Sequence, residues 1–409
     1  MKILLINRSD LRGGAAIAAF RLMNALNANG QQAKMMVQEK LSDNDNVVQL
    51  GSNLTNRWNF LAERTRIFAR NRFSRRNLFD VSVADRGLSV TNHPLFREAE
   101  IIHLHWINQG MLSLNEIGRI LSSGKKVIWT MHDMWPFTGI CHHAAGCDRY
   151  ESGCGCCPYL AVPSQQDLSH QRFLAKQATY ARGSVTFVAC SNWLKRLAEK
   201  SPLTRGHQLH SIPNPIDTTH YKPMDKREAR DRLGLPQEKK ILLFAAAKAS
   251  DPRKGRDYLI KASRILAEQG EEIQILIAGS HGEEMQQQLA LPTTIMGYVT
   301  PSDMPSLYNA VDLYVTSSLL ENLPNTIMEA MACGTPCVAF DTGGIPEMID
   351  HRKNGYVARY KDVEELANGI RWALQEEIHA SLSASARTKA EEMYAQEKAA
   401  NEYLKIYAS

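Results

Sequence analysis

Short apolar runs alternate with segments of helical spacing along the first half of the chain. The first run covers residues 2–7. After a loop that contains Gly13 and Gly14, an apolar face with helical spacing continues to Gly30. Three further runs are typical of buried strands and lie at residues 101–106, 127–132 and 185–190. This alternation predicts βαβ units that form one mainly parallel, doubly wound sheet.

The second half repeats the pattern after a turn-rich segment at residues 214–217. Its apolar runs are separated by helix-like segments and lie at residues 241–245, 273–278, 311–317 and 336–340. We therefore expect an α/β protein with two Rossmann-like domains, at residues 1–215 and 216–385, and a final helix over residues 386–409. Since ligands of such sheets bind beyond the carboxyl ends of the strands, we expect the site in a cleft between the domains.

Composition narrows the class of protein. The 409 residues are 44% hydrophobic and 22% charged, close to globular averages, which excludes a disordered chain or a coiled coil. Residues 1–7 lead into a charged loop without the apolar stretch of a signal peptide, and no apolar run reaches the roughly 18 residues of a membrane span. We expect a cytoplasmic protein that does not span a membrane.

The net charge of +5 conceals an uneven distribution of charged residues between the two halves of the chain. Residues 1–215 carry 26 Lys and Arg against 15 Asp and Glu, whereas residues 216–385 carry 18 against 24. Much of the basic excess lies in one short segment, at Arg57, Arg64, Arg66, Arg70, Arg72, Arg75 and Arg76. The asymmetry indicates that the first half meets an anionic partner.

Two interpretations of this arginine-rich segment stay open. In the first, it is a helix with a solvated cationic face and a core face made of Trp58, Phe60, Leu61, Ile67, Phe68 and Phe73. In the second, it is an interfacial helix that binds an anionic membrane surface, where a lipid-linked acceptor would reside.

The densest polar motif follows the apolar run at residues 311–317. Glu321 lies in a turn, and Glu329 lies in a helix that we expect to begin near Asn325. Two carboxylates so placed can accept hydrogen bonds from separate parts of one polyhydroxylated ligand. The backbone amides at the start of the helix offer an anion site.

A cationic loop follows the apolar run at residues 241–245. It contains Lys248, Arg253 and Lys254, just before another helix. Fixed positive charge of this kind can stabilise a diphosphate leaving group without a metal ion. The loop and the two carboxylates together favour a site for a ligand that has both phosphate and sugar.

These motifs resemble the retaining GT-B glycosyltransferases of family 4. The resemblance is carried by Glu321-x7-Glu329 within residues 318–347, by Lys254-Gly255 and by the sequence IPNPID at residues 212–217. The segment HDMWPFTGICHH is similar to the members that act in bacterial exopolysaccharide and surface-antigen synthesis. The resemblance implies two Rossmann-like domains with the acceptor on the first and the nucleotide-sugar on the second. It also implies that the final helix crosses back to the first domain.

The family pattern implies roles for individual residues of the second domain. Glu329 would bind the ribose hydroxyls, Glu321 would face the transferred sugar and Lys254 would bind the diphosphate. Lys248 stands where the family has an arginine, which keeps the charge but loses the bidentate geometry. We expect further donor contacts from Arg253, Gly297, Tyr298, Val299, Asn322, Leu323, Pro324 and Asn325.

The resemblance extends to the first domain. Gly13 and Gly14 match a glycine turn that approaches the donor phosphate, and His132 matches an active-site histidine near the donor sugar. We expect a UDP- or GDP-sugar as donor and a glycan or lipid-linked glycan as acceptor. We expect no cofactor in catalysis and no nucleic-acid partner.

Five of the eight cysteines lie between residues 141 and 157. The spacing of Cys141, Cys147, Cys154 and Cys157 is compatible with a tetrahedral thiolate site for a structural zinc ion. The alternatives are free or locally packed thiols, and disulfides, which a reducing cytoplasm disfavours.

Two other functions remain as alternatives. One is a basic, zinc-containing protein that binds a polyanion, against which the acidic second half argues. The other keeps the GT-B fold but changes the reaction to epimerisation or phosphorolysis, which product analysis would reveal.

Overall fold

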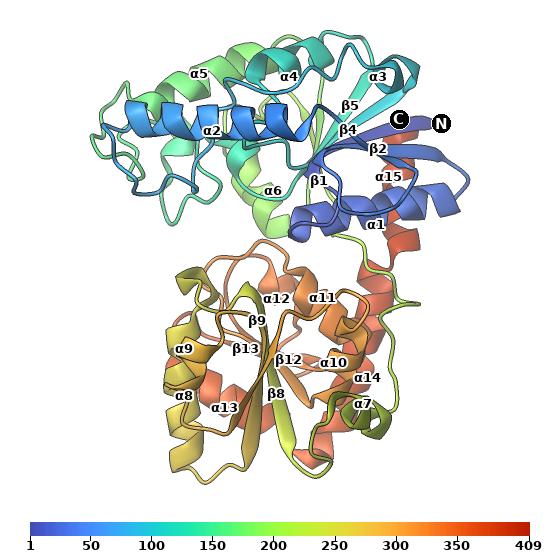
Figure 1. The fold of residues 1–409 in the computed structure, drawn as a ribbon, viewed down its shortest axis with the longest axis vertical. Coiled ribbons are helices and arrows are strands. Elements are labelled where there is room, and N and C mark those ends of the chain that lie inside the picture. Colours follow the sequence, from blue (N-terminus) through green and yellow to red (C-terminus); the bar gives the residue numbers. More distant parts are fainter. The chain divides into compact units, whose positions relative to one another are not determined.

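The computed structural model describes residues 1–409 and divides the chain into two compact units (Figure 1). The first unit contains Met1–Pro215 and Ala399–Ser409, and the second contains Ile216–Lys398. Each unit holds one parallel sheet with helices on both faces. The predicted fold class, two Rossmann-like α/β domains, is therefore confirmed.

The first sheet has seven parallel strands in the order β3-β2-β1-β4-β5-β6-β7, so the strand order reverses between β1 and β4. Four strands match the predicted apolar runs: β1 (Lys2–Ser9), β4 (Ile101–Leu104), β5 (Lys126–Met131) and β6 (Thr186–Ala189). The apolar pattern missed three strands nearer the edges: β2 (Gln32–Glu39), β3 (Val47–Gln49) and β7 (Gln208–Ser211).

Successive side chains along each strand point to opposite faces of this sheet. Leu4 and Trp129 belong to the core beneath α4 (Leu114–Leu121) and α5 (Leu168–Tyr180). Ile3 belongs to the core beneath α1 (Gly14–Ala28) and α15 (Gln396–Ala408). The remaining helices of the unit are α2 (Asn53–Arg70), α3 (Pro94–Glu98) and α6 (Asn192–Glu199).

The arginine-rich segment forms the expected helix, α2, only as far as Arg70, and its predicted apolar core face is mostly wrong. Trp58, Leu61 and Phe73 are exposed, and Ile67 is the one predicted core residue that is fully buried. Polar residues occupy the inner side of the helix instead, at Asn56, Asn59, Glu63 and Arg64.

The second sheet has six parallel strands in the order β10-β9-β8-β11-β12-β13. Four match the predicted runs: β8 (Lys240–Lys248), β9 (Ile273–Ser280), β11 (Leu313–Thr316) and β12 (Cys337–Phe340). The two edge strands were not predicted: β10 (Thr293–Gly297) and β13 (Gly355–Ala358). The helices of this unit are α7 (Lys226–Leu233), α8 (Arg256–Glu268), α9 (Glu283–Gln286), α10 (Met304–Ala310), α11 (Asn325–Ala332), α12 (Ile345–Met348), α13 (Val363–Ala373) and α14 (Glu376–Tyr394). No helix of the chain has both the length and the apolar character that a bilayer span requires.

The segment expected as one helix over residues 386–409 is two helices, α14 and α15, that meet at Ala395. α14 belongs to the second unit, where Leu382 joins the core of the sheet. Residues from Ala399 onward belong to the first unit, where α15 lies beneath the blue strands of Figure 1 and buries Tyr403 and Tyr407. The part of the chain that joins the first unit is thus shorter than expected.

Candidate functional site

The second unit gathers the predicted donor residues at the carboxyl ends of two neighbouring strands. β8 and β11 lie side by side where the strand order reverses, which is the usual ligand position in such sheets. A short 3-10 helix, Pro252–Lys254, follows β8 and carries Lys254. The loop after β11 carries Glu321.

Lys254 and Glu321 form an ion pair between these two loops, through Nζ and Oε1. The loops are also joined by their backbones, since the Leu319 amide donates to the Arg253 carbonyl at 2.8 Å. Gly255 permits this approach because it has a positive φ of 68°. A Cβ there would lie 1.8 Å from the Ser317 carbonyl oxygen. The pair is therefore held by the local fold.

A third loop supports Glu321 from the side of β12. The Gly344 amide donates to the Asn322 carbonyl at 2.8 Å. Gly343 has a φ of 60°, and a Cβ there would lie 1.7 Å from the Glu321 carbonyl oxygen. The glycine at position 343 therefore allows the loop after β12 to pack against the loop that carries Glu321.

Glu329 lies in the second turn of α11 and is 6% exposed. Its Oε2 accepts a hydrogen bond of 3.0 Å from the Tyr308 hydroxyl, which orients the carboxylate. α11 begins at Asn325, as predicted, and no side chain caps its start at Pro324. Its first amides are suited to an anion.

The other predicted donor residues take no part in the ion pair. Lys248 ends β8 with an exposed side chain that forms no ion pair, and Arg253 pairs with Asp251 at 2.8 Å. Gly297 ends β10 with a φ of 65°, and the following Tyr298 is 80% exposed. Val299 is half-buried beside it, and the turn residues Asn322 and Leu323 are buried, whereas Pro324 is half-buried. The structure thus groups Lys254, Glu321 and the start of α11, and leaves Lys248 and Tyr298 without contacts to them.

In the first unit, Gly13 caps the start of α1 with a φ of 94°, and Gly14 is the first helical residue. A Cβ at Gly13 would meet no atom within 4 Å. The glycine is therefore required by its backbone angle, and the space beside it is open. No side chain caps this helix start either.

His132 follows β5 and is part of a histidine pair that the sequence did not predict. Its Nε2 lies 3.1 Å from Nδ1 of His105, which follows the neighbouring strand β4, and its Nδ1 lies 3.4 Å from the Cys190 sulfur. Burial lowers the pKa of His132 to about 4, despite the nearby Asp133 carboxylate. His132 is therefore neutral at pH 7 and can both donate and accept a hydrogen bond.

The two histidines of β4 and its end, His103 and His105, have different surroundings. His103 is fully buried between the Tyr407 hydroxyl and the Thr130 hydroxyl, each at 2.7 Å, which makes it a core residue. His105 is buried but contacts His132, so it belongs with the candidate site. The contact between His105 and His132 could have been predicted from two signals. These are the alternation of side chains along β4 and the neighbouring positions of β4 and β5 in the sheet.

Asp133 anchors a further buried network that the sequence did not predict. Its carboxylate accepts hydrogen bonds of 2.7 Å from Trp106 Nε1 and from His142 Nδ1. Burial alone would raise the pKa of Asp133, but the charge and hydrogen bond of His142 lower it to about 2. This network fixes the loop that continues from His132.

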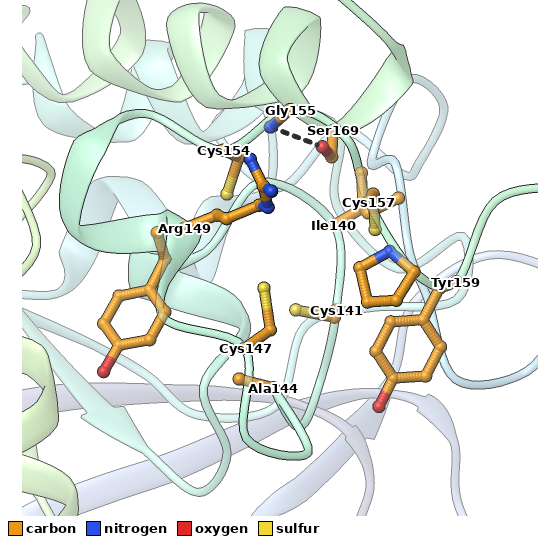
Figure 2. A pocket seen from close by; sticks show the side chains of 12 residues that line it. Ile140, Cys141, Ala144, Cys147, Arg149, Cys154, Gly155, Cys157, Tyr159 and Ser169 are labelled. Atoms are coloured by element: carbon orange, nitrogen blue, oxygen red, sulfur yellow. Dashed lines mark hydrogen bonds between the residues drawn. The ribbon is translucent and has the colours of Figure 1, made fainter. Parts of the chain in front are cut away.

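The four cysteines of the predicted zinc site line one pocket with Arg149 and Tyr159 (Figure 2). All eight cysteines are free thiols. Burial raises the pKa of Cys141 to about 12 and those of Cys154 and Cys157 to about 11. No group of three or more His, Cys, Asp and Glu side chains is placed to hold a metal ion. Zinc binding therefore stays a prediction that would require the sulfur atoms to move.

Two family models match consecutive parts of the chain. The model described as Glycosyltransferase Family 4 matches residues 12–220, and the model described as Glycosyl transferases group 1 matches residues 225–393.

Individual relatives match over part or all of the chain. A D-inositol 3-phosphate glycosyltransferase of Saccharomonospora viridis is 28% identical over 215 residues, 48% of this chain and 48% of that protein. The chain thus aligns with about half the length of this relative. The fold of sucrose-phosphate synthase from Thermosynechococcus elongatus has a TM-score of 0.69 at 19% identity and covers 99% of this chain and 98% of that one. HepE of Anabaena, solved with UDP and glucose, has a TM-score of 0.64 at 18% identity over 100% of both chains.

Proposed function

Since the chain belongs to glycosyltransferase family 4, we propose that it transfers a sugar from a nucleoside diphosphate sugar to a glycan or lipid-linked glycan, with retention of the anomeric configuration. The second unit binds the donor and the first binds the acceptor. The pathway we propose is the synthesis of a bacterial surface polysaccharide, to which the HDMWPFTGICHH segment points.

The observation that carries the proposal is the ion pair between Lys254 and Glu321. A half-buried cation and a carboxylate at the strand ends suit the two parts of a nucleotide-sugar, the diphosphate and the sugar hydroxyls. Glu329, oriented by Tyr308, accepts hydrogen bonds from the ribose. A polyanion such as nucleic acid would be repelled by these carboxylates.

The proposed reaction breaks the bond between the anomeric carbon and the diphosphate, and negative charge develops on the leaving oxygen. Lys254 and the first amides of α11 stabilise that charge because they are already in place before the reaction. The acceptor hydroxyl forms the new bond to the anomeric carbon, and its proton passes to the departing diphosphate, whose oxygen carries the developing negative charge. Neutral His132 and Glu321 bind hydroxyls of the sugar. Lys254 supplies the charge that a metal ion provides elsewhere, so we expect transfer to need no metal.

The experiment that tests the proposal begins with ligand binding. The melting temperature of the purified protein is measured with UDP, GDP or ADP. The nucleotide that raises it most is then replaced by the corresponding nucleotide-sugars, and the measurement is repeated. We try UDP-sugars first, because the fold-related HepE was solved with UDP and glucose. Mass spectrometry and NMR then follow the product on glycan acceptors. A glycoside with the donor's configuration supports the proposal, whereas a sugar phosphate or an epimerised donor contradicts it.

A further inference from the structure

Helix α2 differs from a typical helix on the surface of a globular protein, because it exposes large apolar side chains and buries an acidic and a basic one, Glu63 and Arg64. Such a helix normally buries its apolar face and exposes its polar one. In α2 the spacing of Leu54, Trp58 and Leu61 places them on one face, and this face is outward: Leu54 is 81% exposed and Trp58 65%. The outward face of α2 therefore carries a strip of three large apolar side chains in contact with water.

Specific polar contacts hold α2 in this orientation. Glu63 Oε1 accepts hydrogen bonds from the amides of Val83 and Ala84, at 2.9 and 3.1 Å. Arg64 pairs with Glu63 at 3.1 Å and donates to the Val81 carbonyl at 3.0 Å. Buried groups of this kind lose their partners if the helix rotates, which costs several kcal/mol. The outward direction of the apolar residues is therefore fixed by the fold.

The chain after α2 extends the same surface. Phe73 is 72% exposed and Phe79 is 61% exposed. Their rings contact Phe68 and Phe60 of α2, with centroids 5.5 and 6.4 Å apart. Five of the chain's twelve exposed large hydrophobic residues thus lie between residues 54 and 79. A concentration of this kind marks an interaction site.

The same stretch has an excess of positive charge, and Arg66 is its one exposed arginine with an acidic partner, Asp85 at 2.7 Å. Its exposed arginines that form no ion pair are Arg57, Arg70, Arg72, Arg75 and Arg76. The single acidic residue between positions 53 and 79 is Glu63, which is buried. We call these five arginines and the five exposed hydrophobic residues the α2 surface (Figure 1 shows α2 along the outside of the first unit).

We propose that the α2 surface docks on the surface of an anionic phospholipid bilayer. Arginines near such a surface contribute about 1 kcal/mol each, and aromatic and aliphatic side chains enter the interface between them. A nucleic acid or acidic glycan would use the arginines but has no place for Leu54 and Leu61. The inference is independent of the proposed transferase activity, because it rests on the exposure and charge of this segment alone.

Vesicle flotation without any sugar nucleotide tests the docking. The full chain is mixed with vesicles of phosphatidylcholine alone, or of phosphatidylcholine with phosphatidylglycerol, at low and at high salt. We expect binding to the anionic vesicles only, weakened by salt. Failure to bind anionic vesicles at low salt overturns the proposal, as does equal binding to both compositions.

Two sets of variants identify the surface. We expect the R72Q/R75Q/R76Q variant to lose about a hundredfold in partition to anionic vesicles, at about 1 kcal/mol for each arginine. The L54S/W58S/L61S variant should lose at least about tenfold, because its apolar contacts with the bilayer are removed. Leu174→Ser and Arg205→Gln, exposed elsewhere in the first unit, are the matched controls and should bind as the wild type does.

Comparison of vesicle binding between the arginine variant and the L54S/W58S/L61S variant distinguishes a membrane from other anionic partners. Loss of binding in the arginine variant with full binding in the L54S/W58S/L61S variant would indicate a general polyanion site and overturn the proposal. Circular dichroism melting checks that each variant is folded. The substituted side chains are exposed, so we expect unchanged melting temperatures.

Discussion

Lys254 is held by Glu321 although the two residues are 67 positions apart and follow different strands. Under the proposed function, the Glu321 carboxylate occupies the place next to Lys254 Nζ that a diphosphate oxygen of the donor would take. Donor binding would then exchange one anionic partner of Lys254 for another and release Glu321 for the hydroxyls of the sugar. The ion pair thus keeps the cation in position before the substrate arrives.

This exchange predicts different effects for substitutions of the two partners. Lys254→Met should weaken UDP binding and lower kcat by about 10²- to 10³-fold, as for the loss of other preorganised charges at a leaving group. Glu321→Gln should lower kcat similarly but leave UDP binding equal or tighter, because the competing carboxylate is gone. Isothermal calorimetry and initial rates measure both. Lys261→Met, on the exposed side of α8, is the control, and near wild-type turnover of Lys254→Met would contradict the assignment.

Substitution of Glu329 should weaken binding of the nucleoside part of the donor and leave binding of the diphosphate part unchanged. Its carboxylate is buried and oriented by Tyr308, so Glu329→Gln should weaken UDP binding by about 10- to 100-fold, the value of one or two hydrogen bonds to a charged group. Inorganic diphosphate lacks the ribose and should bind the variant as it binds the wild type. Calorimetry with the two ligands makes the comparison. Equal losses for both would show that Glu329 acts on the fold of α11 rather than on the ribose.

Substitution of two glycines with nearly equal φ angles should distinguish the cost of backbone strain from the cost of a steric clash. Gly270 has a φ of 75° and open space around its missing Cβ, whereas Gly255 has a φ of 68° and lies against the Ser317 carbonyl. Gly270→Ala should therefore cost about 1 kcal/mol of strain and leave UDP binding unchanged. Gly255→Ala should destabilise more and also weaken UDP binding, because the loop that carries Lys254 must move. Calorimetric melting and UDP titration check this, and identical behaviour of the two variants would refute it.

The buried histidines predict a loss of stability in mild acid. Burial lowers the pKa of His103 to about 3 and that of His132 to about 4, below the ordinary value of 6.5. Between pH 6.5 and about 4 the unfolded chain binds these protons and the folded chain does not. The free energy of unfolding should therefore fall with pH across this window, by on the order of 1.4 kcal/mol per pH unit for each histidine.

Urea unfolding followed by tryptophan fluorescence measures this slope for the first unit, because five of the six tryptophans lie within residues 1–215. In His132→Asn one of the titrating groups is removed, and the slope should decrease. A free energy of unfolding that stays constant from pH 6.5 to pH 5 would show that these histidines are not neutral in the folded protein.

The cysteine pocket predicts unreactive thiols in the native state. Since burial raises the pKa values of Cys141, Cys154 and Cys157, their thiolate fraction at pH 8 is about a hundredfold below that of an ordinary cysteine. Iodoacetamide should label them slowly in native protein and rapidly in urea. Cys156, which is half-exposed and does not line the pocket, is the internal reference in the peptide mass spectra. A stoichiometric zinc content would show instead that the four sulfurs close on an ion, as their spacing suggested.

The sequence predicted the central elements well and the edges poorly, for physical reasons. Strands such as β5 and β8 are buried on both faces, so they appear as continuous apolar runs. The edge strand β7 alternates exposed and half-buried residues and gives no such signal. α11 and its buried Glu329 were also found, because the motif that contains them is local in the sequence.

Features that depend on distant contacts could not be predicted. The orientation of α2 depends on amides of Val83 and Ala84, which no local pattern associates with Glu63. The packing of Gly343 against Glu321 likewise appears only when loops from different strands are brought together. The His105–His132 contact needed the order of strands in the sheet, which the apolar pattern does not contain.

The return of α15 to the first unit affects how the protein is made. Tyr403 donates to or accepts from Thr130, and Tyr407 contacts His103, so the interior of the first sheet is completed by residues after 398. A ribosome that has finished residues 1–215 has not yet made these tyrosines, and the intervening second unit must be synthesised first. The core of the first unit can therefore close only after the residues that follow the second unit have been translated, and until then one face of its sheet remains available to chaperones.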